Sequence, residues 1–295
     1  MPLLAGVAKD IKLSHSIFAL PFAVFGAFLA RAPDAAWTTF AAQLALVVVC
    51  MVAARTWAMV INRLADRKWD AANPRTAGRL FAAGRASARD GAIVAGLCAV
   101  LFVLAACGFG IGLGNWLPAL LSVPVLAWIA LYSFTKRFTW ACHLFLGGAL
   151  AASPLAAAIA VRPAYLMESP AAWWLAGMVA LWVAGFDVIY ALQDLDFDRD
   201  VGLRSVPARF GAAGAVWISR SLHLLALAAL VLAWHSDARL GWLTGAAVGT
   251  VGLLLLAEHL VLARRGQAGL EMAFFTLNGV VSCVLGSLGA IDTLF

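Results

Sequence analysis

Residues 37–79 read WTTFAAQLALVVVCMVAARTWAMVINRLADRKWDAANPRTAGR, and this stretch joins two opposite kinds of sequence. Its first part, residues 37–61, is an apolar run longer than the roughly 20 residues that a helix needs to cross a membrane. Its second part, Asn62 to Arg79, is rich in acids and bases. The stretch therefore predicts a membrane-spanning helix that ends in a polar, functional segment.

The composition extends this interpretation to the whole chain. Of its 295 residues, 64% are hydrophobic and 12% are charged, with a mean hydropathy of +0.92, whereas soluble domains are roughly 45–50% apolar and about 25% charged. We expect an all-α, polytopic membrane bundle that forms a single domain over residues 1–295. Nucleic acid is not an expected partner, because the bases lie in short loops between apolar segments. The sequence leaves the oligomeric state open.

Nine apolar segments are candidates for membrane-spanning helices. They cover approximately residues 14–30, 37–61, 91–111, 116–133, 140–161, 172–193, 213–233, 240–262 and 272–292. The first is short for a span, and Pro21 is expected to bend it. Sixteen of the 21 Lys and Arg residues fall on the side that holds the N-terminus and the long loops, and three fall on the other. This bias places the N-terminus in the cytoplasm and, after nine crossings, the C-terminus outside.

The polar segment that follows residue 61 has the spacing of a metal-binding helix face. Asn62, Asp66 and Asp70 lie at i, i+4 and i+8, so their side chains project from one side of a helix. Two carboxylates and an amide oxygen are ligands of the kind that Mg²⁺ takes. Bases are interleaved with these acids, namely Arg63, Arg67, Lys68, Arg75 and Arg79. Acids that hold a metal among bases suit an anionic ligand, and a diphosphate carried on metal ions fits that description.

A second acidic segment, Asp187 to Ser205, repeats this arrangement at the end of another apolar run. Asp187, Tyr190, Asp194 and Asp198 lie at i, i+3, i+7 and i+11 and are expected on one helical face. We expect the two acidic helix ends to face each other across one site. Asp187 lies deepest in its apolar segment, and an ionisable group inside a membrane helix is a functional hypothesis by default.

A basic turn after the fourth apolar segment reads YSFTKR over residues 132–137. Two interpretations are open: Lys136 and Arg137 anchor the chain on the cytoplasmic side, or they bind diphosphate oxygens and stabilise the charge of the leaving group. Tyr132 lies four residues before Lys136, on the same helical face. Two histidines, His15 and His143, are expected near this side, each more often as a packed polar residue than as a catalytic one.

Taken in order, these motifs resemble those of the UbiA superfamily of intramembrane aromatic prenyltransferases. The matching positions are Asn62, Asp66 and Asp70 for N-D-x-x-D-x-x-x-D, Asn73, Arg75 and Thr76 for N-x-R-T, Tyr132 and Lys136 for Y-x-x-x-K, and Asp187, Tyr190, Asp194 and Asp198 for the second acidic motif. One departure is Arg63, which stands where the family usually has an aspartate. The resemblance covers nearly the whole chain.

The resemblance implies Mg²⁺-dependent transfer of a polyprenyl group from its diphosphate to a hydroxylated aromatic acid, in a bacterial inner membrane with lipid around the prenyl chain. The implied metal ligands are Asn62, Asp66, Asp70, Asp194 and Asp198. The diphosphate ligands are Arg67, Lys136, Arg137, Tyr132 and Arg75. Residues expected at the acceptor are Lys12, His15 and Tyr190, while Asp187, Asp66 and Asp194 are the expected catalytic acids.

The acceptor is the least specified part of this hypothesis. Residues 12–22, KLSHSIFALPF, look like those of a bacterial branch that prenylates a dihydroxynaphthoate, so 4-hydroxybenzoate and 1,4-dihydroxy-6-naphthoate both stay open. Two competing hypotheses are a family member with a haem or chlorophyll acceptor, and a transporter that uses intramembrane acids. A transporter would place acids near the middle of the bilayer, whereas both acidic segments here fall at one end of the predicted helices.

Overall fold

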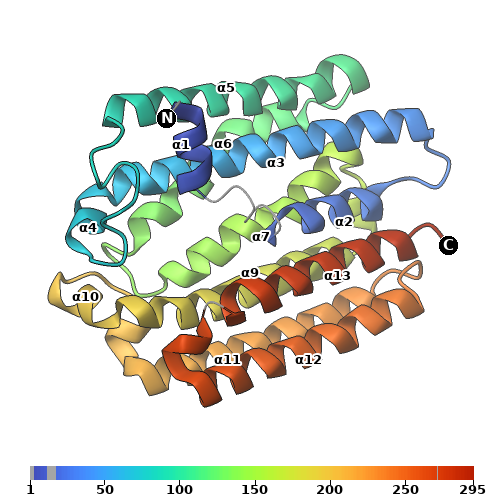
Figure 1. The fold of residues 1–295 in the computed structure, drawn as a ribbon. Coiled ribbons are helices and arrows are strands. Elements are labelled where there is room, and N and C mark those ends of the chain that lie inside the picture. Colours follow the sequence, from blue (N-terminus) through green and yellow to red (C-terminus); the bar gives the residue numbers. More distant parts are fainter. Residues whose placement is uncertain (1–2, 12–17, 271) are drawn as a thin grey trace. The chain divides into compact units, whose positions relative to one another are not determined.

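The computed structural model describes residues 3–11, 18–270 and 272–295, and within these ranges it contains helices and no strand. Figure 1 follows the helices along the chain. The α-helices are α1 (Leu3–Asp10), α2 (Leu20–Ala30), α3 (Trp37–Ala65), α4 (Arg67–Ala72), α5 (Ala88–Leu113), α6 (Leu117–Thr135), α7 (Cys142–Val161), α8 (Tyr165–Glu168), α9 (Ala171–Tyr190), α10 (Leu195–Asp200), α11 (Val206–His235), α12 (Trp242–Arg265) and α13 (Asn278–Asp292). Two 3₁₀ helices, η2 (Ala191–Asp194) and η3 (Gly266–Gly269), and a π-helix, η4 (Met272–Leu277), complete the described elements.

Eight helices of the described residues are long and apolar enough to cross a membrane, which confirms the multi-pass helical class. The predicted count of nine is not confirmed, because the first predicted segment contributes α2, which has 11 residues. A helix of that length extends only about 16 Å. Pro21 lies in the first turn of α2, where a missing N–H costs no helical hydrogen bond. The expected bend of the segment at Pro21 stays a prediction, because residues 14–17 lie outside the described residues.

The chain divides into two compact units. Unit 1 comprises residues 1–16 and 48–134, and unit 2 comprises residues 17–47 and 135–295. In unit 1, buried side chains from α1, α3, α5 and the segment before α5 form one apolar cluster that includes Ile11, Val60, Phe81 and Val94. The segment ends at a capping box, in which Ser87 and Asp90 satisfy each other's backbone N–H groups and start α5.

Unit 2 is built around α9, whose neighbours are α7 and α11. Trp182, Phe22 and Phe186 are buried together in its apolar core, with Phe22 and Trp182 meeting edge to face. Small residues allow close helix contact: a methyl group on Gly147 of α7 would clash with the carbonyl of Ala180 in α9. Figure 1 shows α9, α11, α12 and α13 running side by side. The long helices α7, α9 and α11, which pack together, run between the two ends of this unit.

The start of α11 differs from the prediction. The helix begins at Val206, seven residues before the predicted boundary, because Ser205 accepts a hydrogen bond from the N–H of Ala208 and Pro207 occupies the first turn. A kink at Gly211, with φ of 72°, separates this polar first turn from the apolar run. Apolar periodicity begins after the kink, so hydropathy alone finds only the second part of the helix. The early start places Ser205 and Val206 beside the acidic segment of unit 2.

Candidate active site

The acidic residues of unit 1 lie where α3 ends and α4 begins. The N–H of Asp66 donates to the carbonyl of Asn62 at 2.9 Å, and the N–H of Asp70 donates to the carbonyl of Asp66 at 2.8 Å. These bonds keep helical spacing through the junction, as the i, i+4, i+8 pattern predicted. The amide of Asn62 also donates to Asp66 Oδ2 at 3.2 Å, so these two side chains are in contact.

Asp70 is the buried acid of unit 1, with 7% of its surface exposed. Arg79 Nη1 lies 2.6 Å from Asp70 Oδ1, whereas Oδ2 is buried and has no hydrogen-bond partner among the described residues. A buried carboxylate oxygen that lacks a donor is costly in free energy. Asp70 therefore offers a position that a cation would stabilise, with Arg79 already balancing part of its charge.

Helix α1 brings a carboxylate that the sequence motifs did not reveal. Asp10 Oδ1 accepts from the N–H of Leu80 at 2.6 Å, and Asp10 Oδ2 lies 3.4 Å from Arg63 Nε. Arg63 Nη1 in turn donates to Asn62 Oδ1 at 2.9 Å. Asp10 thus pairs with the arginine that departs from the expected acidic motif. In the sequence, Asp10 is a single acid near the N-terminus with no motif around it, so sequence reasoning could not identify it.

The remaining predicted diphosphate ligands of unit 1 occupy different surroundings. The side chains of Arg67 and Arg75 are exposed, so both are accessible to an anionic ligand. The N–H of Arg75 donates to Asn73 Oδ1 at 3.0 Å, which fixes the turn after α4. The hydroxyl of Tyr132 lies 3.9 Å from Met59 Sδ, a weak contact. Their roles at a diphosphate stay predictions.

In unit 2, Lys136 and Asp198 form an ion pair. Lys136 Nζ lies 2.8 Å from Asp198 Oδ1, and the carboxylate side chain is only 1% exposed. Burial lowers the pKa of Lys136, but Asp198 and then Asp194 more than offset burial, so this pKa lies above its ordinary value. Ser205 Oγ donates to Asp198 Oδ2 at 3.0 Å. A protonated lysine and a helix-capping serine therefore hold this carboxylate in place.

The turn that carries Lys136 is fastened by Arg204. The N–H of Arg204 donates to the carbonyl of Lys136 at 2.7 Å, and its Nη1 donates to the carbonyl of Phe138, also at 2.7 Å. Arg204 was not predicted as a site residue, and its role here is to position the turn. Arg137 and Tyr190 of the predicted set are half-buried in the same unit.

A 3₁₀ turn separates the acids of the second motif. After α9 ends at Tyr190, residues 191–194 wind as η2, and α10 begins at Leu195. Three residues per turn in place of 3.6 change the direction of later side chains. The predicted single face through Asp187, Asp194 and Asp198 therefore does not follow a regular helix. Asp194 and Asp198 are both buried, whereas Asp196 and Asp200 are exposed.

Asp187 is paired with a histidine. Its Oδ2 lies 2.6 Å from His143 Nδ1, with side-chain exposures of 24% for the acid and 4% for the histidine. His143 Nε2 accepts from the N–H of Val206 at 3.2 Å. The sequence favoured a packing role for His143. The structure adds a carboxylate partner, which could not be inferred because α7, α9 and α11 meet only in the folded unit.

Lys12 and His15, predicted to meet the acceptor, lie outside the described residues. The expectation that the acidic ends of the two units face each other stays a prediction. Within the described ranges, no group of three His, Cys, Asp or Glu side chains has the spacing of a metal site. The donor types nevertheless fit Mg²⁺, because it uses few carboxylates per ion and shares phosphate oxygens, and the unpartnered Asp70 Oδ2 is a hard-oxygen donor of that kind.

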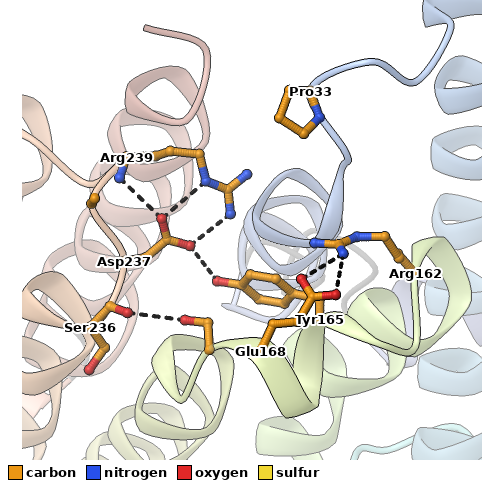
Figure 2. A pocket seen from close by; sticks show the side chains of 9 residues that line it. Pro33, Arg162, Tyr165, Glu168, Ser236, Asp237 and Arg239 are labelled. Atoms are coloured by element: carbon orange, nitrogen blue, oxygen red, sulfur yellow. Dashed lines mark hydrogen bonds and ion pairs between the residues drawn. The ribbon is translucent and has the colours of Figure 1, made fainter.

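The other end of unit 2 has a pocket of about 350 Å³ (Figure 2). The phenol of Tyr165 donates to Asp237 Oδ2 at 2.7 Å, and Arg239 Nη2 lies 2.7 Å from the same oxygen. Arg162 Nη1 lies 2.6 Å from Glu168 Oε2. Each acid of this pocket is therefore matched by an arginine, and the dashed contacts in Figure 2 run between the lining residues themselves.

Comparison with known proteins identifies the family of this chain. A model of the UbiA prenyltransferase family matches residues 19–280. A 4-hydroxybenzoate octaprenyltransferase from Nitrosomonas eutropha is 31% identical over 258 residues, covering 85% of this chain and 84% of that protein. The apo structure of a UbiA homolog from Aeropyrum pernix K1 is 31% identical, with a TM-score of 0.79 over 95% of this chain and 98% of that one.

A second solved structure, a UbiA homolog from Archaeoglobus fulgidus bound to GPP and Mg²⁺, is 17% identical, with a TM-score of 0.72 over 98% of this chain and 99% of that one. At this identity it supports the fold. Together with the helical membrane architecture, these matches define a membrane-bound prenyltransferase. The chain belongs to the UbiA prenyltransferase family.

Proposed function

We propose that this chain transfers a polyprenyl group from a polyprenyl diphosphate to a hydroxylated aromatic carboxylic acid in the synthesis of a respiratory quinone. The observation that carries the proposal is the buried Asp198, which Lys136 contacts at 2.8 Å beside a second buried acid, Asp194. Membership of the prenyltransferase family supplies the reaction class. The names of relatives such as the N. eutropha protein favour 4-hydroxybenzoate as the acceptor.

The acids of both motifs are the proposed ligands of Mg²⁺: Asn62, Asp66, Asp70, Asp194 and Asp198. When bound, the ion acts as a Lewis acid that neutralises charge on the departing diphosphate. The GPP and Mg²⁺ bound by the A. fulgidus homolog support a prenyl diphosphate as the substrate and Mg²⁺ as the metal. Asp66 and Asp194 are proposed to be required for catalysis in this way.

Cations of the chain are proposed to bind the diphosphate oxygens. Lys136 is protonated and held against Asp198, so it supplies a fixed positive charge while the allylic C–O bond breaks. Arg137 follows it in the same turn, and the exposed Arg67 and Arg75 are proposed to reach the diphosphate from unit 1. The phenol of Tyr132 is proposed as a further donor.

Asp187 is proposed to orient the acceptor's hydroxyl group or to take the ring proton after the aromatic carbon has attacked the prenyl group. The side chain is 24% exposed while its histidine partner is buried, so one side of the carboxylate remains open. Tyr190 lies one turn further along α9 and is proposed to contact the ring. Lys12 and His15 are proposed to bind the acceptor's carboxylate.

The membrane has a chemical role in this proposal. Water would quench an allylic cation, and a long prenyl chain needs apolar surroundings, which lipid and the helices supply. The proposed location is the bacterial inner membrane, with the N-terminus in the cytoplasm as the Lys and Arg bias indicates. The C-terminus would lie outside only if the chain crosses the membrane nine times. The first predicted crossing contributes α2, which has 11 residues, so this position of the C-terminus stays a prediction.

The test uses purified protein in nanodiscs with geranyl diphosphate and Mg²⁺. Two acceptors, 4-hydroxybenzoate and 1,4-dihydroxy-6-naphthoate, are offered separately, and Asp66→Ala and Asp194→Ala serve as controls. The proposal predicts a Mg²⁺-dependent prenylated product that both substitutions abolish, and the acceptor that reacts identifies the quinone route. Diphosphate binding without any product would overturn the acceptor assignment, and absence of both binding and product would overturn the proposed function.

A further inference from the structure

A network of hydrogen bonds in unit 2 passes through His143, which the proposed reaction does not yet use. The ring is buried, with 3% of the residue exposed, and both of its nitrogens have partners. Nδ1 lies 2.6 Å from Asp187 Oδ2 on α9, and Nε2 lies 3.2 Å from the N–H of Val206 on α11. One side chain from α7 therefore connects two other helices.

The partners of His143 fix its tautomer. A backbone N–H is always a donor, so Nε2 must accept with its lone pair. The proton of the neutral ring then lies on Nδ1, from which it is donated to Asp187 Oδ2. This bond occupies one carboxylate oxygen and sets the plane of the group. Oδ1 is then the oxygen that an acceptor's hydroxyl would use.

The network continues from Val206 to the diphosphate residues. Ser205, the residue before Val206, caps α11 and donates to Asp198 Oδ2 at 3.0 Å. Asp198 Oδ1 lies 2.8 Å from Lys136 Nζ. The start of α11 is therefore held on one side by His143 and on the other by Asp198.

We infer that His143 is a positioning residue, which holds Asp187 as an oriented carboxylate toward the aromatic acceptor and ties it, through the start of α11, to the Asp198–Lys136 pair. The inference rests on the proposed function. It assigns His143 no contact with substrate. Its two ring nitrogens have separate tasks: Nδ1 serves the acceptor, and Nε2 serves the first turn of α11.

A purely structural histidine is available for comparison in the same unit. His223 is also 3% exposed, but its Nδ1 lies 3.1 Å from His259 Nε2, and a methyl group on Gly185 would clash with its ring. Substitution of His223 is expected to loosen helix packing without moving Asp187. His223→Gln therefore controls for the general cost of changing a buried histidine.

Two substitutions distinguish the roles of the two ring nitrogens of His143. The amide nitrogen of asparagine lies near the position of Nδ1, and the amide group of glutamine reaches the position of Nε2. We expect His143→Asn to keep the donor to Asp187, with an acceptor KM within about threefold of wild type. His143→Gln keeps a partner for Val206 but loses that donor, so its acceptor KM should rise on the order of ten- to a hundredfold, as for a lost bond to a charged group. Its KM for geranyl diphosphate should stay within about threefold.

The measurements are steady-state KM and kcat for each substrate, acceptor binding at equilibrium, and Tm in nanodiscs. His223→Gln should lower Tm and leave both KM values unchanged. Equal losses of kcat in His143→Asn and His143→Gln, with unchanged acceptor KM and acceptor binding, would overturn the inference and leave His143 a packing residue. Wild-type protein that forms no prenylated acceptor would overturn the proposed function instead, so the two failures are distinguishable.

Discussion

The two ends of unit 2 use charge in opposite ways. At one end lie three acids: Asp187 on α9, Asp194 on η2 and Asp198 on α10, of which Asp198 is paired with Lys136 and Asp187 with His143. At the other end lies the Figure 2 pocket, where Asp237 and Glu168 each have an arginine. At the first end Asp194 and Asp198 are buried beside Lys136, whereas at the second end each acid is paired with an arginine, so we call the second end the balanced end.

The balanced end explains what a structural ion network does. Arg239 Nη2 donates to the carbonyl of Leu29 at 2.6 Å, and Arg162 Nε donates to the carbonyl of Ala30 at 3.1 Å. Both arginines therefore satisfy carbonyls at the C-terminal end of α2, where a helix lacks internal donors. The acids of this pocket hold those arginines in place. At the opposite end the buried Asp194 and Asp198 lie beside Lys136, and this is the end that we propose binds Mg²⁺ and a diphosphate.

The largest expected contrast comes from matched carboxylate-to-amide substitutions. Asp198→Asn should lower the rate of prenyl transfer by about a hundred- to a thousandfold, because a proposed Mg²⁺ ligand and the carboxylate that holds Lys136 in place are lost together. Asp237→Asn should leave the rate within about twofold and lower the free energy of unfolding by about 2 kcal/mol. Transfer rates and denaturation of both variants check this. Loss of activity in a well-folded Asp237→Asn protein would break the comparison.

The cations of the two ends give the second contrast. Lys136→Met should lower kcat/KM for prenyl diphosphate by about a hundredfold, since the fixed charge on the diphosphate is lost. Arg239→Met should preserve kcat/KM but lower the free energy of unfolding by about 1–2 kcal/mol, because α2 loses donors at its end. The measurements are kcat/KM for prenyl diphosphate and Tm, made on the same preparations of both variants. Similar kinetic losses in both would contradict a division of roles.

A smaller change at the balanced end removes one hydrogen bond. Tyr165→Phe deletes the phenol that donates to Asp237 Oδ2 at 2.7 Å. We expect a loss of about 1 kcal/mol in the free energy of unfolding and unchanged transfer kinetics. The free energy of unfolding is measured by denaturation in detergent for Tyr165→Phe and for Tyr190→Phe, which lies at the other end. Tyr190→Phe should change the KM for the acceptor and leave the stability nearly unchanged.

The smallest expected effect concerns pH. Burial raises the pKa of Asp237, but hydrogen bonds from Arg239 and Tyr165 more than offset burial, so this pKa lies below its ordinary value. A folded pKa below the unfolded one contributes stability above about pH 4, and the contribution is lost as pH falls through the folded pKa. The Tm difference between wild type and Asp237→Asn should be largest near neutrality and shrink below about pH 4. A difference that is constant with pH would contradict this linkage.

Periodicity and local spacing explain what the sequence could predict. Long apolar runs identified the eight helices long enough to span, and the i, i+4 pattern predicted the observed register of Asn62, Asp66 and Asp70. The Ser87 capping box was predictable because its two partners are three residues apart. Each of these features depends on residues that are close in the chain.

Features that depend on distant residues were not predictable. Asp10 meets Arg63, and His143 meets Asp187, only because helices far apart in sequence pack together. The 3₁₀ turn after Tyr190 and the polar first turn of α11 also have no periodic signal, since short irregular windings do not repeat. The sequence therefore revealed the acids of the two motifs and Lys136, but not the contacts of Asp10, His143 and Ser205.

The most direct measurement is the Mg²⁺-dependent affinity of purified protein for geranyl diphosphate, in wild type, Asp70→Asn, Asp198→Asn and Asp237→Asn. It tests whether Asp70 and Asp198, from the two acidic motifs, bind the ligand while Asp237, at the balanced end, has a structural role. We predict that Asp70→Asn and Asp198→Asn weaken binding at least about tenfold, as expected when a charged ligand-binding group is lost, whereas Asp237→Asn binds like wild type. Wild-type affinity in Asp198→Asn, or an equal loss in a folded Asp237→Asn protein, would contradict this division between the two ends.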